Sequence, residues 1–332
     1  MPEVGLPLGD TWAALRDLRV DECADAGLIN HTWLVGEPPR FVLQRVNPLF
    51  RPEVHDDIEA VTAHVQARGL ATPRLVRTES GALCATAADG AAWRLLTYVP
   101  GLTVHKMDGP ARAFAAGALV GRFHRAVDDL EWEYRHVRAG AHDTALHMQR
   151  LAEVVKDGAA LPVAEGILEG WRAWPGRLDL PARHAHGDLK LSNLRFDAAG
   201  SGVCLLDLDT LSRLSLDVEL GDAWRSWCNP VGEDGTDTRL DLELLSAAIA
   251  GYRSSRPLST EEAEGLCFAV ERIALELAAR FCRDAVEDCY FGWNGARFPS
   301  RVAHNLHRAT GQLNLARSAR SQRGAVAAAL GA

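Results

Sequence analysis

The sequence predicts an α+β protein with two lobes: a small antiparallel sheet with one helix, followed by a larger and mainly helical lobe. Three observations support this division. Residues 20–47 contain three short β-rich segments, and the dipeptide Pro100-Gly101 stops a later strand. From about residue 110 onward, apolar residues recur with the period of a helix. We therefore expect lobes at 1–99 and 100–332, joined by a hinge at about 97–101.

The β-rich segments of the first lobe cover residues 20–25, 31–35 and 41–46, and the turn between the first two contains Gly27 and Asn30. A helix is expected over residues 53–68, because Pro52 suits a first helical turn and apolar side chains then recur every three or four residues. Those side chains are Val54, Ile58, Val61 and Val65. Further strands are expected near 75–76, 83–84 and 93–98.

The second lobe has helical patterns from the hinge to the C-terminus. Leu119, Phe123 and Val127 are spaced by four residues, and further helices are expected between 140 and 183. Ser259 and Glu262 have the spacing of a capping box, which predicts the start of one long helix. Its apolar face would consist of Leu266, Val270, Ile273 and Leu277.

Composition limits the function classes. The 332 residues are 47% hydrophobic and carry a formal net charge of −8, which predicts a large core and argues against nucleic acid or an anionic membrane as the main partner. No run of about eighteen apolar residues occurs, and the N-terminus lacks the blocks of a secretion signal, so we expect a cytoplasmic protein. The seven cysteines have no Cys-x-x-Cys spacing and are expected to be reduced core residues.

Residues 184–209 contain a pattern typical of phosphoryl transfer. Asp188 lies in a tight His-Gly-Asp turn, where Gly187 permits an unusual backbone angle, and Asn193 follows five residues later. Apolar residues at 203, 205, 206 and 208 predict a short buried strand that carries Asp207 to the same place. Transfer of a γ-phosphoryl group requires a carboxylate that orients and deprotonates the attacking hydroxyl, and oxygen ligands for Mg²⁺. Asp188 would be that carboxylate, with Asn193 and Asp207 as the metal ligands.

Two other interpretations of this segment were weighed against phosphoryl transfer. One is a surface turn in which the acidic residues have no shared role. The other is a zinc site, because His184-x-His186-x-Asp188 matches the first half of the dinuclear-zinc pattern His-x-His-x-Asp-His. That pattern requires a histidine where this chain has Leu189, and it leaves the asparagine and the second aspartate without a role.

The order His-Gly-Asp, four residues, Asn, and then a strand ending in Leu-Asp resembles the aminoglycoside phosphotransferase and choline kinase superfamily, whose members are distant relatives of protein kinases. The resemblance implies a bilobal, protein-kinase-like fold and a kinase that uses ATP and Mg²⁺. It also implies that the turn with Gly27 and Asn30 lies over the nucleotide phosphates, although an ordinary hairpin turn has the same sequence features. In the superfamily an aspartate before a later helix braces the catalytic loop, and Asp222 is the candidate here.

In such folds the third strand supplies a cation for the α- and β-phosphates, and the next helix supplies an acid that fixes it. Arg45 and Glu59 are our candidates, although Gln44 is the alternative register for the strand position. At the hinge, the backbone of Thr97 and Val99 would form hydrogen bonds with adenine without requiring particular side chains.

The C-terminal region resembles that of N-acetylhexosamine 1-kinases, and the resemblance covers roughly residues 25–317 in scattered blocks. In those kinases an arginine and a tyrosine of the tail help to bind the sugar, and they match Arg280 and Tyr290. The subgroup also has a histidine in the first turn that reaches the sugar, where this chain has Leu28. A missing polar ligand changes substrate choice strongly. The implied acceptor is therefore a sugar, an amino sugar or a related cyclitol.

Two further functions fit the same residues. An aminoglycoside kinase is compatible with the acidic balance and with the tail carboxylates Asp284, Glu287 and Asp288, of which Asp284 is our candidate substrate ligand. A nucleotide-binding regulatory pseudokinase would share the fold. The intact set of predicted catalytic and metal residues favours an active enzyme.

Overall fold

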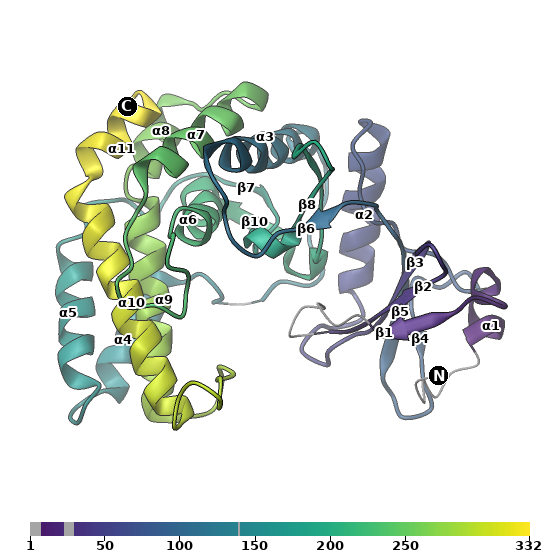
Figure 1. The fold of residues 1–332 in the computed structure, drawn as a ribbon, viewed down its shortest axis with the longest axis horizontal. Coiled ribbons are helices and arrows are strands. Elements are labelled where there is room, and N and C mark those ends of the chain that lie inside the picture. Colours follow the sequence, from purple (N-terminus) through teal and green to yellow (C-terminus); the bar gives the residue numbers. More distant parts are fainter. Residues whose placement is uncertain (1–7, 23–29, 139) are drawn as a thin grey trace.

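The computed structural model describes residues 8–22, 30–138 and 140–332 and confirms the predicted bilobal α+β fold (Figure 1). The first lobe is a five-stranded antiparallel sheet in the order β1-β2-β3-β5-β4, accompanied by the short helix α1 (Leu8–Thr11). Its strands are β1 (Val20–Glu22), β2 (His31–Val35), β3 (Phe41–Arg45), β4 (Ala85–Thr86) and β5 (Ala92–Thr97). The strand expected near 75–76 is only a single bridge between Leu75 and Leu96, and the one expected near 83–84 forms two residues later.

One face of this sheet has its own small apolar core. Leu43 of β3 and Leu95 of β5 are fully buried in it, and the rings of Trp33 and Trp93 stack with their centroids 5.2 Å apart. Trp12 closes the cluster and donates a hydrogen bond of 3.0 Å to the Val76 carbonyl. Because successive strand residues point to opposite faces, residues 44 and 94 face the other side of the sheet.

Helix α2 (Val54–Ala67) belongs to a different core. Its predicted apolar stripe is buried in the large cluster of the second lobe, not in the cluster of the sheet. The Asp57 carboxylate, which is 1% exposed, accepts hydrogen bonds from the Trp132 indole at 2.9 Å and from the amides of Arg135 and His136 at 2.9 and 2.8 Å. Charge-assisted hydrogen bonds of this kind are short and strong. Helix α2 is therefore fastened to the second lobe.

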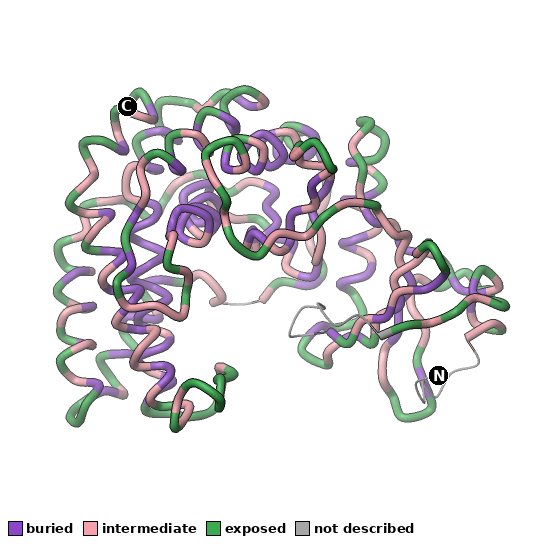
Figure 2. Tube along the Cα trace, viewed as in Figure 1, coloured by how far each residue is buried: buried purple, intermediate pink, exposed green. Residues whose placement is uncertain are grey.

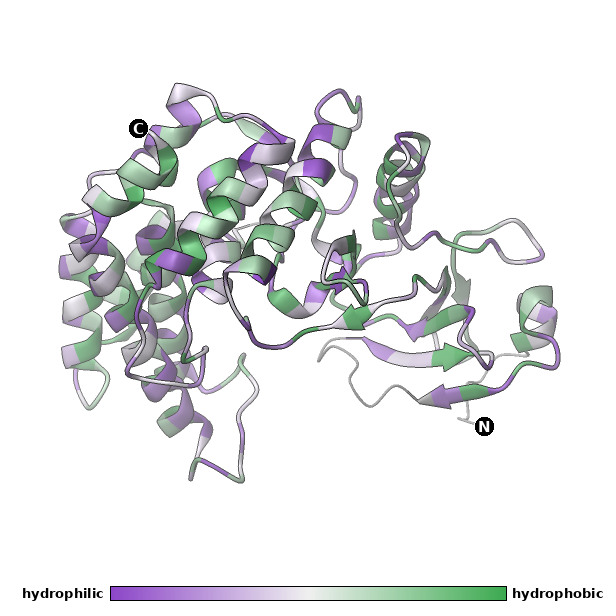
Figure 3. Ribbon diagram, turned by 45° about the horizontal axis from the view of Figure 1, so that its top comes forward, coloured by the Kyte–Doolittle hydropathy of each residue, from purple (hydrophilic) through white to green (hydrophobic). Residues whose placement is uncertain are grey.

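The second lobe is built around three largely buried helices, α3 (Pro110–Val127), α6 (Leu216–Trp227) and α9 (Ala269–Glu287) (Figure 2). Around them lie α4 (Thr144–Val154), α5 (Leu161–Arg172), α7 (Leu242–Ser255), α8 (Thr260–Leu266), α10 (Arg301–Ser321) and α11 (Arg323–Leu330). Hydrophobic and hydrophilic residues alternate along these helices (Figure 3), as expected for amphipathic helices that share one core.

Two small antiparallel sheets hold the segment that contains the predicted motif. Strand β7 (Ala182–Ala185) pairs with β10 (Ser212–Ser215), and β8 (Leu194–Phe196) lies between β6 (Leu102–Thr103) and β9 (Gly202–Leu205). The loops at 186–193 and 206–211 each connect one of these sheets to the other, from β7 to β8 and from β9 to β10, and they lie beside each other. The predicted strand before Asp207 is confirmed, and it ends at Leu205.

The long helix expected after Ser259 is divided into two. Ser259 and Glu262 do form the predicted capping box, but α8 ends at Leu266 and α9 begins at Ala269. The reason is the backbone of Phe268, which leaves the helical region at φ −113° and ψ 1°. The apolar series from 266 to 277 is consequently shared between two helices.

The described helices include none that is both long and apolar enough to cross a membrane. Cys204, Cys228 and Cys282 are buried free thiols, in agreement with the expectation of reduced core residues, whereas Cys289 is an exposed one. Cys23 lies outside the described residues.

Candidate active site

The turn at residues 186–188 has the backbone that the sequence predicts. Gly187 has φ +80°, and a Cβ atom there would lie 2.4 Å from the carbonyl oxygen of Thr210, so any other residue would clash. The Thr210 hydroxyl donates to the His186 carbonyl at 2.8 Å, which ties the two neighbouring loops together. The glycine therefore brings the loop of Asp188 against the loop of Asp207.

The carboxylate that braces this turn is Glu219, not Asp222. Glu219 is buried on α6 and accepts hydrogen bonds from the amides of His186 and Gly187 at 2.8 and 2.9 Å, and from the His124 imidazole at 3.2 Å. Burial alone would raise the pKa of Glu219, but the His124 contact lowers it, so the brace stays ionised. The expectation for Asp222 is thus wrong: its carboxylate instead pairs with Arg225 on the same helix at 2.9 Å.

The three predicted catalytic and metal residues lie together. The Asn193 side-chain amide donates to the carbonyl and to the carboxylate of Asp188, at 2.8 and 3.1 Å. The backbone carbonyl of Asn193 accepts a hydrogen bond of 2.8 Å from the backbone amide of Leu206, which places the adjacent Asp207 next to this pair. Asp207 has the left-handed backbone conformation, with φ 60° and ψ 61°, a strained arrangement for a residue other than glycine.

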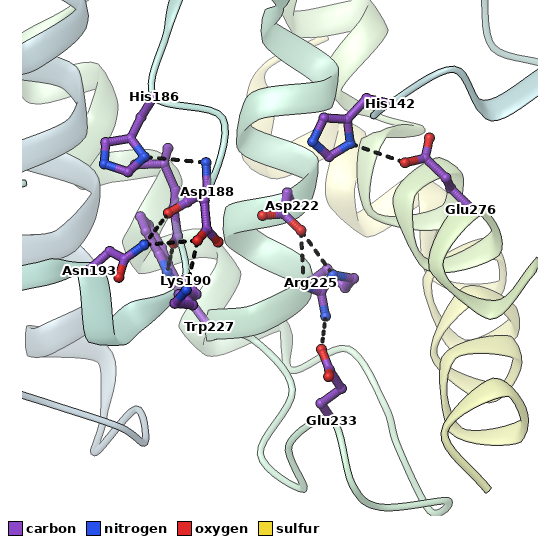
Figure 4. A network of polar contacts seen from close by, with 11 residues as sticks. His142, His186, Asp188, Lys190, Asn193, Asp222, Arg225, Trp227, Glu233 and Glu276 are labelled. Atoms are coloured by element: carbon purple, nitrogen blue, oxygen red, sulfur yellow. Dashed lines mark hydrogen bonds and ion pairs between the residues drawn. The ribbon is translucent and has the colours of Figure 1, made fainter. Parts of the chain in front are cut away.

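Lys190 was missed in the sequence although it lies only two residues after Asp188. Its ammonium nitrogen is 2.7 Å from Asp188 Oδ2 (Figure 4) and 3.8 Å from Asp207 Oδ2. The two carboxylates raise the pKa of Lys190 against the opposing effect of burial. Burial, together with the charge of Asp209, raises the pKa of Asp207 to about 6. Lys190 could have been identified from its position, because it is the basic residue between Asp188 and Asn193 in the sequence.

A cavity of about 560 Å³ lies between the sheet and this cluster. Lys190, Asn193 and Asp207 line one part of it, and the hinge residues Thr97 and Val99 line another. The hinge residues therefore border the cavity, and their hydrogen bonds with adenine stay a prediction.

The hinge is anchored to both lobes by hydrogen bonds. The Thr97 amide donates to the Arg74 carbonyl at 2.8 Å, and the Val99 carbonyl accepts from Arg195 at 3.2 Å. The same guanidinium donates to the Tyr98 hydroxyl at 2.9 Å. Arg195, a residue of β8, thus fixes the hinge to the catalytic segment.

The expected pairing of Arg45 with Glu59 is not formed. Arg45 shares the sheet face of Leu43, away from the cavity, and its half-exposed guanidinium pairs with Asp89 at 2.9 Å. Glu59 pairs with Arg74 at 3.0 Å and Arg77 at 3.3 Å. The alternation of side chains along β3 is the physical reason, because it turns residue 44 toward the cavity and residue 45 away from it.

The predicted phosphate-covering turn is described only at its end. Gly27 and Leu28 lie outside the described residues. Asn30 lines the cavity, and its side chain accepts from the Asn47 amide at 2.9 Å and donates to Asp209 at 2.7 Å.

In the tail, Asp284 has a structural role that excludes the expected one. This carboxylate is 1% exposed and accepts from the amides of Cys289, Tyr290 and Phe291 at 3.1, 2.7 and 2.9 Å. Asn305 also donates to it, at 2.7 Å. Both carboxylate oxygens are therefore occupied in closing the turn after α9, and the expectation that Asp284 contacts a substrate is wrong.

Arg280 and Tyr290 remain near the surface of the same region. The Tyr290 side chain is 52% exposed, and its hydroxyl accepts a hydrogen bond of 3.0 Å from Arg138. The Arg280 guanidinium lies over the Phe291 ring, 5.6 Å from the centroid. Arg280 also acts on Asp222: burial alone would raise the pKa of Asp222, whereas the positive charges of Arg225, His142 and Arg280 lower it.

Asp222 connects this region to the catalytic cluster. Figure 4 shows Asp222 on the side of Asp188 opposite to Asn193, with Arg225 beside it. The charge of Asp222 makes a small contribution to the raised pKa of Lys190. Farther out, His142 pairs with the buried Glu276 at 3.1 Å. Polar and charged side chains, several of them largely buried, therefore extend from Asp188 toward α9.

The two histidines of the alternative zinc pattern form hydrogen bonds with neighbouring groups of the protein. His184 contacts the Leu130 carbonyl at 2.8 Å and the Tyr134 hydroxyl at 2.9 Å, and His186 contacts the Leu206 carbonyl at 2.8 Å. Over the described ranges, no group of three or more His, Cys, Asp and Glu side chains is placed to hold a metal ion. A carboxylate and an amide oxygen are instead a set that suits Mg²⁺, which binds few protein ligands and completes its shell with phosphates and water.

Comparison with known structures supports the same fold. An aminoglycoside phosphotransferase from Alicyclobacillus acidocaldarius superposes with a TM-score of 0.64 and 15% identity, over 96% of this chain and 95% of that one. The amicoumacin kinase hAmiN, in complex with AMP-PNP, Ca²⁺ and Ami, gives a TM-score of 0.61 and 13% identity, over 92% and 91% of the two chains. At such identities these likenesses concern the fold.

Sequence relatives are named homoserine kinases. The protein from Gluconacetobacter diazotrophicus is 30% identical over 205 residues, which are 60% of each chain, and that from Neisseria meningitidis is 27% identical over 223 residues. The matched part spans 60% and 69% of the length of these two relatives. The sequence model of the phosphotransferase enzyme family (APH) matches residues 23–258, a segment that contains the whole catalytic cluster. The chain therefore belongs to the phosphotransferase enzyme family.

Proposed function

We propose that the protein is an ATP- and Mg²⁺-dependent kinase that phosphorylates a hydroxyl group of a sugar, an amino sugar or a related cyclitol. One observation carries the proposal: Asp188, Lys190, Asn193 and Asp207 converge beside a cavity that the hinge also lines. In this proposal residues 1–99 bind the nucleotide, and residues 100–332 supply the catalytic and acceptor-binding groups.

Asp188 is the proposed catalytic base. Its carboxylate orients the acceptor hydroxyl and accepts the proton as the hydroxyl oxygen forms a bond to the γ-phosphorus, while the bond to the β–γ bridging oxygen breaks and ADP leaves. The Asn193 amide holds Asp188 in place through its bond of 3.1 Å to the carboxylate. This arrangement converts a bimolecular encounter into an oriented reaction.

Asp207 and the amide oxygen of Asn193 are the proposed Mg²⁺ ligands. Bound Mg²⁺ would neutralise charge that develops on the phosphates. Lys190 bridges Asp188 and Asp207 in the structure, at 2.7 and 3.8 Å. Because its ammonium group lies between the proposed base and the proposed metal ligand, we assign to it the γ-phosphoryl group as its partner in the complex.

The acceptor is proposed to bind near the polar side chains between Asp222 and the tail. Arg280 and Tyr290 match the sugar-binding residues of N-acetylhexosamine 1-kinases, with one residue fewer between them, and the positive charge of Arg280 contributes to the lowered pKa of Asp222. A sugar presents several hydroxyls, which suits alternating carboxylate and guanidinium partners. The names of the relatives favour a second acceptor, homoserine.

A screen of acceptors tests the proposal. ATP consumption with Mg²⁺ would be measured with hexoses, N-acetylhexosamines, inositols, homoserine, choline and aminoglycosides, each in parallel with the Asp188→Asn protein. We expect the largest Asp188-dependent kcat/KM with a sugar or cyclitol. A clear preference for homoserine or an aminoglycoside would replace the proposed acceptor class, and no Asp188-dependent consumption with any acceptor would favour a pseudokinase.

A further inference from the structure

Two residues of neighbouring strands meet on the cavity face of the sheet. Gln44 of β3 lies directly opposite Arg94 of β5 in the strand register, and both line the cavity. The Gln44 carbonyl oxygen accepts from Arg94 Nε at 2.8 Å, and its amide nitrogen donates to the Thr32 hydroxyl at 3.1 Å. The cavity-facing side chain at this point of β3 is therefore neutral, and the adjacent cation comes from β5.

Asp209 fixes that cation from the second lobe. Both terminal nitrogens of Arg94 donate to the two Asp209 oxygens, one of them at 2.8 Å, and the side chains are only 2% and 1% exposed. A guanidinium has five N–H donors. Gln44 and Asp209 take three of them, the other two form no hydrogen bond with the described residues, and Arg94 lines the cavity.

Other cations on the cavity wall have other partners. Lys190 lies between Asp188 and Asp207 and is already assigned to the γ-phosphoryl group, and Arg195 bonds to Val99 and Tyr98 of the hinge. Arg45 points away from the cavity to Asp89. On the sheet wall, among the described lining residues, Arg94 is the cation available to a phosphate.

We propose that Arg94 binds the α- and β-phosphates of the nucleotide and that Asp209, instead of an acid on helix α2, holds it in position. The inference rests on the proposed function, because it requires a nucleotide in the cavity. It moves the phosphate-binding cation from the third strand to the fifth. Since Asp209 lies two residues after Asp207 in one 3₁₀ turn, the same turn then fixes both the cation and the proposed metal ligand.

A purely structural ion pair is the competing explanation. In that case Arg94 and Asp209 only join the two lobes, and their loss would lower stability and weaken every ligand of the cavity alike. A phosphate-binding arginine would instead affect ligands with phosphates and spare those without. The comparison of Mg·ADP with adenosine distinguishes these cases, because both carry the adenine and ribose.

The principal variant is Arg94→Gln/Asp209→Asn. Removal of Arg94 alone would leave the buried Asp209 charge without a partner and endanger folding. The double variant removes both charges and retains groups that can form hydrogen bonds. Arg45→Gln, on the same sheet but facing away, is the matched control for a lost arginine. Dissociation constants for Mg·ADP and adenosine would be measured by calorimetry, and melting temperatures for all proteins.

We expect the double variant to bind Mg·ADP about tenfold or more weakly, as expected for a lost charge-assisted hydrogen bond, and adenosine within about twofold of wild type. Arg45→Gln should leave both constants within about twofold. Gln44→Lys added to Arg94→Gln places a cation at the adjacent position of β3, and it should restore Mg·ADP affinity above that of the double variant.

The inference is overturned if the double variant weakens Mg·ADP and adenosine in parallel, or if it changes neither. It is also overturned if Arg45→Gln causes the larger loss of Mg·ADP. These outcomes leave the proposed function intact as long as the wild-type protein transfers phosphate in an Asp188-dependent manner. Wild-type protein that binds no Mg·ADP would contradict the proposed function itself.

Discussion

Two clusters of charge meet at the cavity, and they differ in how firmly they are held. The Arg94–Asp209 pair is 2% and 1% exposed, and its hydrogen bonds extend to Gln44 and Asn30. The Lys190 cluster is open by comparison: Lys190 is 38% exposed, Asp188 27% and Asp207 28%. In that cluster the Lys190 ammonium group lies near the carboxylates of both Asp188 and Asp207.

This difference assigns different tasks to the two clusters. A buried, bidentate pair in a low-dielectric site is fixed, and breaking it by removing one partner typically costs about 3–5 kcal/mol. A partly solvated amine between two carboxylates can exchange partners when phosphates and a metal ion arrive, because water screens each contact. We therefore expect the buried cluster to keep its geometry when a nucleotide binds, and we assign the proposed proton and metal chemistry to the open cluster.

The largest effect is expected from Asp188→Asn, which removes one charge of the open cluster and keeps the shape. Turnover should fall by about two orders of magnitude or more, because the proton acceptor is lost, while nucleotide still binds to the intact buried cluster. Steady-state kinetics and calorimetry on the same preparation provide the check. Near-normal turnover would remove Asp188 from its role.

Asp207→Ala should separate metal binding from nucleotide binding. The hard cation loses its main anionic ligand, so the Mg²⁺-dependent part of ADP affinity should fall by about tenfold or more, while adenosine affinity is kept. Titrations of ADP with and without Mg²⁺ measure that part directly. If Mg²⁺ strengthens ADP binding to the variant as much as to wild type, the metal has another ligand.

Arg280→Ala tests whether the open cluster extends to the tail. The kcat/KM for the sugar should fall by roughly tenfold, the effect of one charge-assisted hydrogen bond, with little change in the KM for ATP. Tyr290→Phe should show a smaller loss of the same kind. A structural role for Arg280 on the Phe291 ring predicts instead a lower melting temperature and equal losses for ATP and sugar.

The smallest effect is expected from Glu59→Gln. Glu59 pairs with Arg74 and Arg77 and touches neither cluster, so kcat/KM should change less than about twofold. The matched comparison is Asp57→Asn on the same helix, which would weaken three hydrogen bonds to the second lobe and lower the melting temperature. A large kinetic loss in Glu59→Gln would show that helix α2 does supply the anchoring acid.

The open cluster could be predicted because its residues are close in sequence. Asp188 and Asn193 lie in one loop, and Asp207 directly follows the next predicted strand. The motif spacing in a single segment of the sequence was therefore enough to group the three residues. The positive φ of Gly187 could also be predicted, from its place in the His-Gly-Asp turn, although the close approach to the Thr210 carbonyl depends on the neighbouring loop. The hinge was predictable for the same reason, from the strand that Pro100 and Gly101 end.

The buried cluster could not be found in this way. Arg94 is 50 residues from Gln44 and 115 from Asp209, so the site exists only once strand register and lobe packing are set. Analogy placed the cation at Arg45, and the alternation of β3 places that residue on the opposite face. Asp284 shows a second kind of error. The resemblance of the tail suggested that its carboxylate binds the substrate, but the carboxylate closes a turn by accepting hydrogen bonds from backbone amides.

The most direct test of the account is a ³¹P NMR time course with Mg·ATP and the preferred acceptor of the screen. For the wild-type protein, the γ-phosphate signal of ATP should decrease as one phosphate-ester signal and the signals of ADP appear in equal amounts. The Asp188→Asn protein should leave the ATP spectrum unchanged over the same period. Wild-type protein that binds Mg·ATP but forms only inorganic phosphate, or no product with any acceptor, would contradict the assignment of this site to phosphoryl transfer.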